Sequence, residues 1–473
     1  MLLSFILIPF VTALLLLFIK SDKSANTVAI VSTLGTLVVA LVVAAGKGAV
    51  DFNAPWIPVL NAQFLLHADG LAKILVLLTA ISFPAIIIAT SHNQPKQKNI
   101  FLSLLLFTQS GLMGVFLAGD ALLFYFFWEL ALIPVYFLSS IWGGEKRIAV
   151  TFKFFIYTFL GSLMMLIGII FVYMHTSDQS FLIQSFAKAN LTGGQQVTAF
   201  ALFFIAFAIK MPIFPLHTWQ PDAYEQAPTA VTMVMSAVMV KMGLYGILRW
   251  LMPLFPMAFM AHVNVVVILS VIGVLYASFI AIRQDDIKRL IAYSSIAHIG
   301  LMNAAIFSQL QIGIQGAMVQ LFSHGINVLG LWIVADIIEQ QTGTRSMQQM
   351  GGLAKKQPTL AILLVGFALA NIALPLTNAF VGEFLMFNSL FQYNVWVGAA
   401  AGVSIILAAI YTLNMVQKIA YGEVSTQINQ MQTINKPAQI VLIVLLIIVF
   451  VTGVFPQPLF DLTADSLQQI IVK

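Results

Sequence analysis

The sequence predicts an all-α protein that crosses a membrane many times. Of its 473 residues, 60% are hydrophobic and only 8% are charged, whereas about a quarter of the residues in a soluble domain carry a charge. Apolar runs long enough to cross a bilayer recur from Met1 almost to the end, and the basic residues between them are unevenly distributed. Together these three observations indicate a multi-pass membrane protein without a soluble domain.

The apolar runs define about fourteen transmembrane helices, because a bilayer core of about 30 Å takes roughly 20 helical residues. They are expected near residues 2–20, 27–46, 70–90, 99–118, 121–141, 149–175, 198–220, 228–252, 262–282, 287–307, 310–339, 359–392, 394–418 and 437–455. The run 2–20 has no charged region before it and no convincing cleavage site after it, so it is expected to be the first span and not a signal peptide. The polar stretch 177–198 is expected to be a loop with room for a short surface helix.

The basic residues predict the orientation. With the N-terminus outside, fourteen Lys and Arg fall in cytoplasmic loops, and four fall on the outer side, namely Lys47, Lys188, Arg249 and Lys473. This asymmetry follows the positive-inside rule. The net charge of +5 is scattered over short loops and is not a nucleic-acid signal. The sequence has no cysteine, which excludes disulfides and Cys-ligated iron–sulfur clusters.

A short internal repeat relates two spans that proline interrupts. Residues 207–216 resemble residues 367–376, with Phe, Ala, Pro and Leu in register after a shift of 160 residues. The copies fall in the seventh and twelfth spans, and this odd separation makes them run in opposite directions, as in the inverted repeats of secondary transporters. Since proline removes a backbone donor, both helices are expected to be broken. The expected units are three N-terminal helices (1–98), a first repeat (99–252), a second repeat (260–420) and a C-terminal helix with a tail (437–473).

Several ionisable side chains lie inside the predicted spans. A charge at the bilayer centre costs about 2.5–3.5 kcal/mol on insertion scales, so such residues are normally paired or functional. Lys73 and Lys153 fall within spans as well. The candidate proton pathway consists of Glu129, Lys210, Lys241, His298, His324 and Glu383.

Glu129 and Lys210 are expected to act as a pair. Glu129 lies among aromatic and aliphatic residues, and Asp120 is the expected cap of its helix. Lys210 directly precedes the break in the seventh span, where water can enter. A nearby carboxylate makes a buried lysine hold its proton more firmly. The structural alternatives are a carboxylate wetted at the interface and a lysine that extends to the membrane surface.

The other four candidates are expected to form a chain of proton carriers. Lys241 lies near the middle of its span, where extension to the surface is hardest. His298 and His324 lie among hydroxyls and glycines, and an imidazole can accept a proton at one nitrogen and donate one at the other. Glu383 begins the second half of the broken twelfth span. The alternatives are hydrogen-bonded structural histidines and a carboxylate stabilised by a helix N-terminus. The spacing favours no metal site, and no nucleophile–base pair, phosphate loop or nucleotide fingerprint is present.

At these residues the chain resembles the antiporter-like subunits of respiratory complex I and their relatives in multisubunit Na+/H+ antiporters and membrane-bound hydrogenases. The resemblance is densest from Phe124 to Phe387. The motifs that carry it are Phe127-Trp-Glu129, Lys210-Met-Pro with Pro215-Leu-His217, Pro221-Asp-Ala223, Ala227-Pro-Thr229, Lys241, Arg289 with Tyr293-Ser294 and His298, His324-Gly325, Met350-Gly-Gly-Leu353 and Phe380-Val-Gly-Glu383-Phe384.

The resemblance implies a role for each candidate. Glu129 and Lys210 become a coupling ion pair, Lys241 becomes the central carrier, and Glu383 becomes the terminal group. Glutamate at this last position, where related subunits usually carry lysine, favours the M-type branch. An end soon after the fourteenth span, without the long lateral helix of the L-type branch, fits the same branch.

The resemblance also implies a cellular setting. The expected protein is a proton-translocating, non-redox subunit of a NADH:quinone oxidoreductase in the bacterial inner membrane, driven by electron transfer in other subunits. It implies no cofactor in this chain, FMN and iron–sulfur clusters on partner subunits, and neighbouring antiporter-like chains as partners.

The chain departs from the family pattern at two places. Residues 375–380 read Pro-Leu-Thr-Asn-Ala-Phe where the family has Pro-Gly-Thr-X-Gly-Phe, which leaves the shape of the second break open. Tyr224 stands where histidine is common, and Glu225 is an extra charge; both are expected to lie off the main axis.

Three alternative functions stay open at this point. A subunit of a Na+/H+ antiporter or of a membrane-bound hydrogenase would keep the same proton pathway in another complex. A solitary secondary transporter would need substrate-shaped polar side chains at the breaks. An inert scaffold would have no use for two lysines in mid-span.

Overall fold

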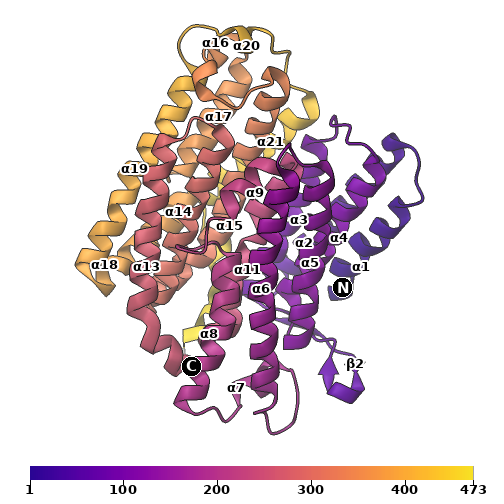
Figure 1. Ribbon diagram of the computed structural model, residues 1–473, viewed down its shortest axis with the longest axis vertical. Coiled ribbons are helices and arrows are strands. Elements are labelled where there is room, and N and C mark those ends of the chain that lie inside the picture. Colours follow the sequence, from indigo (N-terminus) through magenta and orange to yellow (C-terminus); the bar gives the residue numbers. More distant parts are fainter. Residues whose placement is uncertain (472–473) are drawn as a thin grey trace.

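The computed structural model describes residues 1–471 and consists almost entirely of helices, most of which run along its long axis (Figure 1). Within these residues, 12 helical segments are long and apolar enough to cross a membrane. They are α2 (Asp22–Ala45), α3 (Gly70–Ala89), α4 (Lys98–Leu117), α5 (Ala121–Trp142), α6 (Arg147–Tyr173), α8 (Gly193–Lys210), the composite helix Thr229–Leu254, α13 (Pro256–Arg283), α14 (Ile287–Phe307), α15 (Gln311–Thr342), α19 (Val395–Ala420) and α21 (Lys436–Val454). The predicted all-α membrane fold is therefore confirmed.

Two shorter apolar helices, α1 (Leu2–Leu16) and α17 (Pro358–Asn371), lie at positions where the sequence predicts spans. The second is continued by α18 (Asn378–Tyr393). The count of fourteen spans, the two inverted repeats and the unit boundaries stay predictions.

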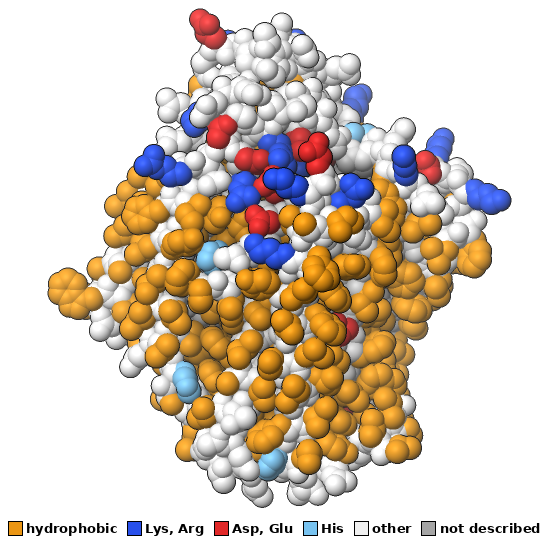
Figure 2. All heavy atoms as spheres, viewed as in Figure 1, with side chains coloured by type: hydrophobic (Ala, Val, Ile, Leu, Met, Phe, Trp, Pro, Cys, Tyr) orange, Lys and Arg blue, Asp and Glu red, His pale blue; other side chains and the backbone are white. Residues whose placement is uncertain are grey.

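The two ends of the molecule differ in charge. Figure 2 shows a broad apolar belt, with Lys, Arg, Asp and Glu gathered toward the end that carries α16 (Leu353–Lys356) and α20 (Thr426–Asn429) in Figure 1. Large apolar side chains of the long helices, such as Ile167 and Ile268, are about half exposed, which is expected where a helix faces lipid. We call the charge-rich end the charged end and the opposite one the hairpin end. The positive-inside rule predicts that the charged end faces the cytoplasm.

The hairpin end contains elements that the sequence did not predict. Strands β1 (Val50–Phe52) and β4 (Leu66–Ala68) pair antiparallel, as do β2 (Pro55–Ile57) and β3 (Ala62–Gln63). The expected surface helix is present as α7 (Ile183–Ala187). The predicted tail forms a further helix, α22 (Gln457–Ile471), which packs on α3 and α15. Lys473, counted above among the outer charges, lies outside the described residues.

Aspartates begin three of the helices around the site. The side chain of Asp120, the predicted cap of α5, accepts hydrogen bonds from the backbone N–H groups of Leu122 (2.9 Å) and Leu123 (3.0 Å). Its second oxygen accepts one from Gln63 in β3 (3.0 Å). Asp69 and Asp286 cap α3 and α14 in the same way. These caps fix the helix ends against the loops that cover them.

Both predicted helix breaks are present. α8 ends at Lys210, and α9 (Gln220–Gln226) begins after an irregular stretch that contains Pro212 and Pro215. The indole N–H of Trp219 donates to the carbonyl of Ile209 (3.0 Å), which satisfies one backbone group that the break leaves unpaired. The second break separates α17 from α18, and both glycines of the family pattern are missing there.

The second break keeps left-handed backbone without glycine. Ala373 has a φ of 54° and Leu376 a φ of 78°. Left-handed backbone at an L-residue costs about 1–2 kcal/mol of conformational free energy. The Leu376 side chain is 66% exposed, so it contributes little packing in return. The local backbone preference of these residues opposes the break, so the packing of the surrounding helices must stabilise it.

We expect Leu376→Gly to raise the thermal midpoint of the assembled protein slightly. Glycine relieves the backbone strain, and its greater freedom in the unfolded chain offsets part of that gain, by about 0.4–1 kcal/mol. Leu376→Ile is expected to lower the midpoint, because a β-branched residue tolerates positive φ poorly. Thermal unfolding followed by tryptophan fluorescence compares the two, and a lower midpoint for the glycine variant would contradict the assignment of strain.

The composite helix Thr229–Leu254 is irregular around Lys241. Two π-helical segments, η2 (Met235–Met239) and η3 (Ile247–Leu251), flank the regular turns of α11 (Lys241–Gly246). In η2 the N–H of Val240 donates to Met235 O, five residues earlier (3.1 Å). Such segments occur frequently at functional sites. They change the direction of side chains and free backbone carbonyls from the regular α-helical hydrogen bonds.

Candidate proton-relay site

Lys241 lies at the centre of the buried polar groups. Its side chain is fully buried, and its ammonium donates to the carbonyl of Ser236 in η2 (2.6 Å). The same nitrogen lies 2.9 Å from Nδ1 of His324 on α15. An ammonium has donors only, so a charged Lys241 requires His324 Nδ1 to be the unprotonated acceptor. A proton that leaves Lys241 therefore has an acceptor already in contact.

The chain of groups continues from His324 to Glu383. The imidazole rings of His324 and His298 lie 5.4 Å apart between centroids. His298 Nδ1 lies 2.9 Å from the Glu383 carboxylate, which also accepts a hydrogen bond from Gln320 (3.2 Å). Four of the six predicted residues, on α11, α15, α14 and α18, thus form one continuous path.

The path has two unpaired ring nitrogens and, beside His298, room for a water molecule. Nε2 of His298 and Nε2 of His324 have no hydrogen-bond partner among the described residues, although both atoms are buried. A cavity of about 20 Å³ adjoins His298, Glu383 and Tyr411, which is enough for one water molecule. Buried polar atoms are normally satisfied, so these two nitrogens are the points of the path that the protein itself leaves free for a further hydrogen bond.

Glu129 and Lys210 lie apart from this path and are not in direct contact. Lys210 is buried, and its ammonium lies 5.6 Å from the Trp128 ring and 6.0 Å from the Phe154 ring. Its Nζ and the Glu129 Oε1 atom both lack a hydrogen-bond partner within residues 1–471. The aromatic rings partly compensate the buried cation. The structure therefore contains the predicted pair in an open arrangement.

The remaining two lysines inside spans have structural partners. Lys73 donates to the carbonyls of Gly46 (2.7 Å) and Gly48 (2.8 Å) at the hairpin end. Lys153 forms an ion pair with Asp222 (2.9 Å) and donates to the Thr218 carbonyl. Both side chains are satisfied locally, which distinguishes them from Lys210.

Tyr224 lies closer to the environment of Lys241 than the sequence indicates. It is fully buried, its ring packs on Trp332 (5.8 Å between centroids), and its hydroxyl lies beside the side chains of Gln220 and Ser236. The Tyr224 hydroxyl, the Ser236 hydroxyl and the Gln220 amide have no geometrically good partner among the described residues. Tyr224 contacts none of the six candidate residues directly, but it lies beside Ser236 in η2, whose carbonyl accepts from Lys241. The four-residue spacing of Gln220 and Tyr224 on one helix face was the available signal.

A network of ion pairs surrounds a cavity at the charged end. Glu225 binds Arg289 (2.7 Å) and Arg345 (3.1 Å), and Lys288 binds Glu339 (2.5 Å) and the Thr229 hydroxyl (2.9 Å). The cavity has a volume of about 520 Å³, and its lining includes Glu225, Thr229, Lys288, Asp336 and Glu339. Thr229 begins the composite helix that carries Lys241, so this cavity brings water to the near end of that helix. Glu225, the extra charge in the sequence, binds both arginines, and one of them, Arg345, also lines the cavity.

No group of three or more His, Cys, Asp or Glu side chains within residues 1–471 could hold a metal ion.

Comparisons with known proteins identify a family and a fold. The family model described as NADH:quinone oxidoreductase/Mrp antiporter, TM matches residues 118–410. The chain is 36% identical to the NADH-quinone oxidoreductase subunit M of Rhodobacter capsulatus, over 95% of this chain and 91% of that one. It is also 36% identical to the subunit M of Escherichia coli K12, over 89% of this chain and 85% of the relative.

Solved structures agree with this fold. A chain of respiratory complex I from Thermus thermophilus, solved with bound NADH, is similar with a TM-score of 0.92 and 27% identity, over 100% of both chains. A chain of the Mrp complex from Dietzia sp. DQ12-45-1b has a TM-score of 0.91 and 21% identity over 99% of this chain and 97% of that chain, a likeness of fold alone.

Proposed function

This chain belongs to the family of membrane subunits found in NADH:quinone oxidoreductases and Mrp antiporters, and from this premise we propose that it is the proton-translocating M subunit of a bacterial NADH:quinone oxidoreductase. The full-length similarity to two proteins named subunit M supports this choice of complex over an Mrp antiporter, and glutamate at position 383 points the same way. In this proposal the redox cofactors, FMN and iron–sulfur clusters, belong to partner subunits, and neighbouring antiporter-like chains flank this one in the inner membrane.

The observation that carries the proposal is the continuous path from Lys241 through His324 and His298 to Glu383. Each of these groups can take up and release a proton; Lys241 contacts His324, His298 contacts Glu383, and the two imidazole rings lie 5.4 Å apart between centroids. The path crosses the interior of an apolar bundle, where ionisable side chains are costly unless they function.

We propose that Glu129 and Lys210 couple this path to events elsewhere in the complex. When Glu129 approaches Lys210, the ammonium is stabilised; when they separate, as in this structure, Lys210 holds its proton less firmly. The proton then moves toward Lys241, and Lys241 releases its own through the histidines to Glu383. The cavity at the charged end, which the positive-inside rule places in the cytoplasm, supplies the next proton.

Purification of the chain in mild detergent, with mass spectrometry of the proteins that accompany it, tests the choice of complex. We expect flavin- and iron–sulfur-bearing NADH dehydrogenase subunits. Na+/H+ antiporter subunits or hydrogenase subunits would move the same proton path to another complex and contradict the proposal, and no partner at all would favour a solitary transporter.

We also propose that the Tyr224 hydroxyl, which lies beside Ser236, helps to pass protons toward Lys241, and Tyr224→Phe tests this role. The variant keeps the ring on Trp332 and removes only a hydroxyl that forms no direct protein hydrogen bond, so assembly should be unchanged. We expect NADH-driven proton translocation to fall about tenfold or more, because positioned proton-transfer groups contribute at least that much. Tyr136→Phe, which removes a half-buried hydroxyl from α5, is the control. Unchanged pumping by Tyr224→Phe would remove this hydroxyl from the route.

A further inference from the structure

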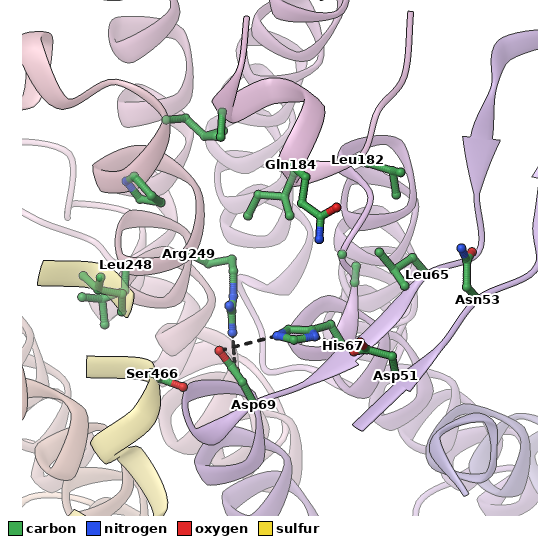
Figure 3. Close-up of a pocket in the computed structure, with 17 residues that line it drawn as sticks. Asp51, Asn53, Leu65, His67, Asp69, Leu182, Gln184, Leu248, Arg249 and Ser466 are labelled. Atoms are coloured by element: carbon green, nitrogen blue, oxygen red, sulfur yellow. Dashed lines mark hydrogen bonds and ion pairs between the residues drawn. The ribbon is translucent and has the colours of Figure 1, made fainter. Parts of the chain in front are cut away.

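A second cluster of ionisable groups lies at the hairpin end, outside the proton path (Figure 3). It surrounds a cavity of about 530 Å³ formed between the β-strands, α7, the end of the composite helix and α22. Arg249 and Asp69 are in direct contact deep in this cavity. At its rim, His67 lies 2.5 Å from Asp51 and 3.8 Å from Asp69. Water can reach the cluster, since the side chain of Asp51 is 61% exposed.

The same helix connects this cavity to Lys241. Lys241, Tyr245 and Arg249 follow at four-residue intervals along the composite helix. Tyr245 is fully buried; its hydroxyl donates to the Phe116 carbonyl (2.9 Å) and accepts from Arg249 Nε (3.2 Å). About two helical turns therefore separate the main proton carrier from water at the hairpin end.

Nothing in this segment can relay a proton in the arrangement seen. Both the donor and an acceptor position of the Tyr245 hydroxyl are occupied. An arginine side chain does not release its proton. The ammonium of Lys241 turns the other way, toward Ser236 and the charged end. A fixed cation and a buried phenol therefore stand between Lys241 and the cavity.

Asp69 holds the arginine in place. It caps α3 through the Ala72 N–H (3.0 Å), so its position is set by the helix. Burial raises the pKa of Asp69, but the charge and hydrogen bonds of Arg249 lower it further, to about 2. Because this pKa lies below the ordinary value of about 3.9, the pair contributes its full stability above that value and loses it only as the pH falls toward 2. The pair therefore persists at every pH at which a respiratory membrane works.

We propose that Arg249, held by Asp69, is an electrostatic barrier that keeps protons in the water of the hairpin end from returning along this helix to Lys241. A fixed arginine at a narrow passage repels protons and other cations. The barrier rests on the proposed function, because it takes Lys241 as a proton carrier and the hairpin end as the outer face. With this barrier, the path through His298 and Glu383 can release protons against a gradient, because protons do not flow back passively to Lys241.

Passive proton leak through the complete complex tests the barrier. Reconstituted vesicles without NADH receive a potassium diffusion potential that drives protons from the hairpin-end side, and a pH-sensitive dye reports their flux. We expect Arg249→Gln to raise the leak at least about tenfold, because a unit charge a few ångströms from a proton changes a barrier by more than one tenfold step. Adding Lys241→Ala to the same chain should return the leak to the starting level. Lys188→Gln, which removes an exposed cation at the same end, should leave the leak unchanged.

The possible outcomes separate the barrier from the proposed function. An unchanged leak in Arg249→Gln, with NADH-driven pumping intact, would overturn the barrier and leave the proposed function standing. A leak that persists in the double variant would show protons bypassing Lys241 and would also overturn it. If Arg249→Gln does not assemble because Asp69 is left unpaired, Asp69→Asn with Arg249→Gln removes both charges, leaves no unpaired carboxylate and carries the same expectation. Failure of the proposed function is separate, because it appears as intact pumping in Lys241→Ala alone.

Discussion

Replacing Lys241 by alanine is expected to abolish proton translocation through this subunit while the complex still assembles. The ammonium is the group that joins the Ser236 carbonyl to His324, and alanine leaves a gap between them with no ionisable side chain. Assembly should survive, because the helix packs through its other residues and alanine is a strong helix former. The loss is expected to be complete for this path, since no other titratable side chain of the helix contacts His324.

The measurement is NADH-driven acidification in vesicles beside the rate of NADH oxidation, which together give the protons moved per electron pair. Lys241→Arg sharpens the test, because arginine keeps the charge and does not release its proton. It is expected to pump as poorly as alanine. Lys188→Ala, on the exposed surface, is the matched control. A fully coupled Lys241→Ala complex would end the assignment of Lys241 as a carrier.

Sequence reasoning selected four residues that the structure brings together, because the cost of burying a charge limits where ionisable residues occur. His298, His324 and Glu383 are separated by many residues, yet each lies in an apolar run, and the only economical arrangement places them together. The contact of Lys241 with His324, 83 residues away, depends on how α11 packs against α15. No local pattern specifies that packing, so the order of the two histidines, His324 before His298, came from the structure.

The features that were missed depend on tertiary context. The π-helical segments around Lys241 come from packing in a fully buried helix and have no marker residue. The burial of Tyr224 beside Ser236, whose carbonyl accepts from Lys241, depends on how α9 packs against η2. At the second break, Leu376 occupies a left-handed position that local preference assigns to glycine. In each case long-range packing overrode a local preference.

The open arrangement of Glu129 and Lys210 has a physical basis. Lys210 lies against the faces of Trp128 and Phe154, which stabilise a cation without a carboxylate. The energy difference between open and closed arrangements is thereby reduced, and small electrostatic changes from neighbouring subunits can shift the balance. Such a small preference suits the coupling role that we propose for the pair.

Glu383→Gln is expected to lower NADH-driven proton translocation by more than about tenfold, the usual scale for loss of a positioned proton-transfer group. Glutamine has nearly the same shape and can still accept a hydrogen bond from His298 and from Gln320, so the local packing should hold. It cannot take up the proton that His298 delivers, and the path then ends at an imidazole.

Glu383→Asp and Glu423→Gln complete this experiment. Aspartate keeps the carboxylate but shortens the side chain, so it is expected to recover part of the pumping through a longer, water-assisted contact with His298. Glu423 is exposed at the charged end, and its change to glutamine should have no effect. If Glu383→Gln pumps normally, protons leave the chain before Glu383, and the small cavity beside His298 and Tyr411 becomes the place where the route turns toward water. If pumping falls and aspartate restores part of it, the carboxylate itself is the terminal carrier, because packing alone would favour glutamine over the shorter acid.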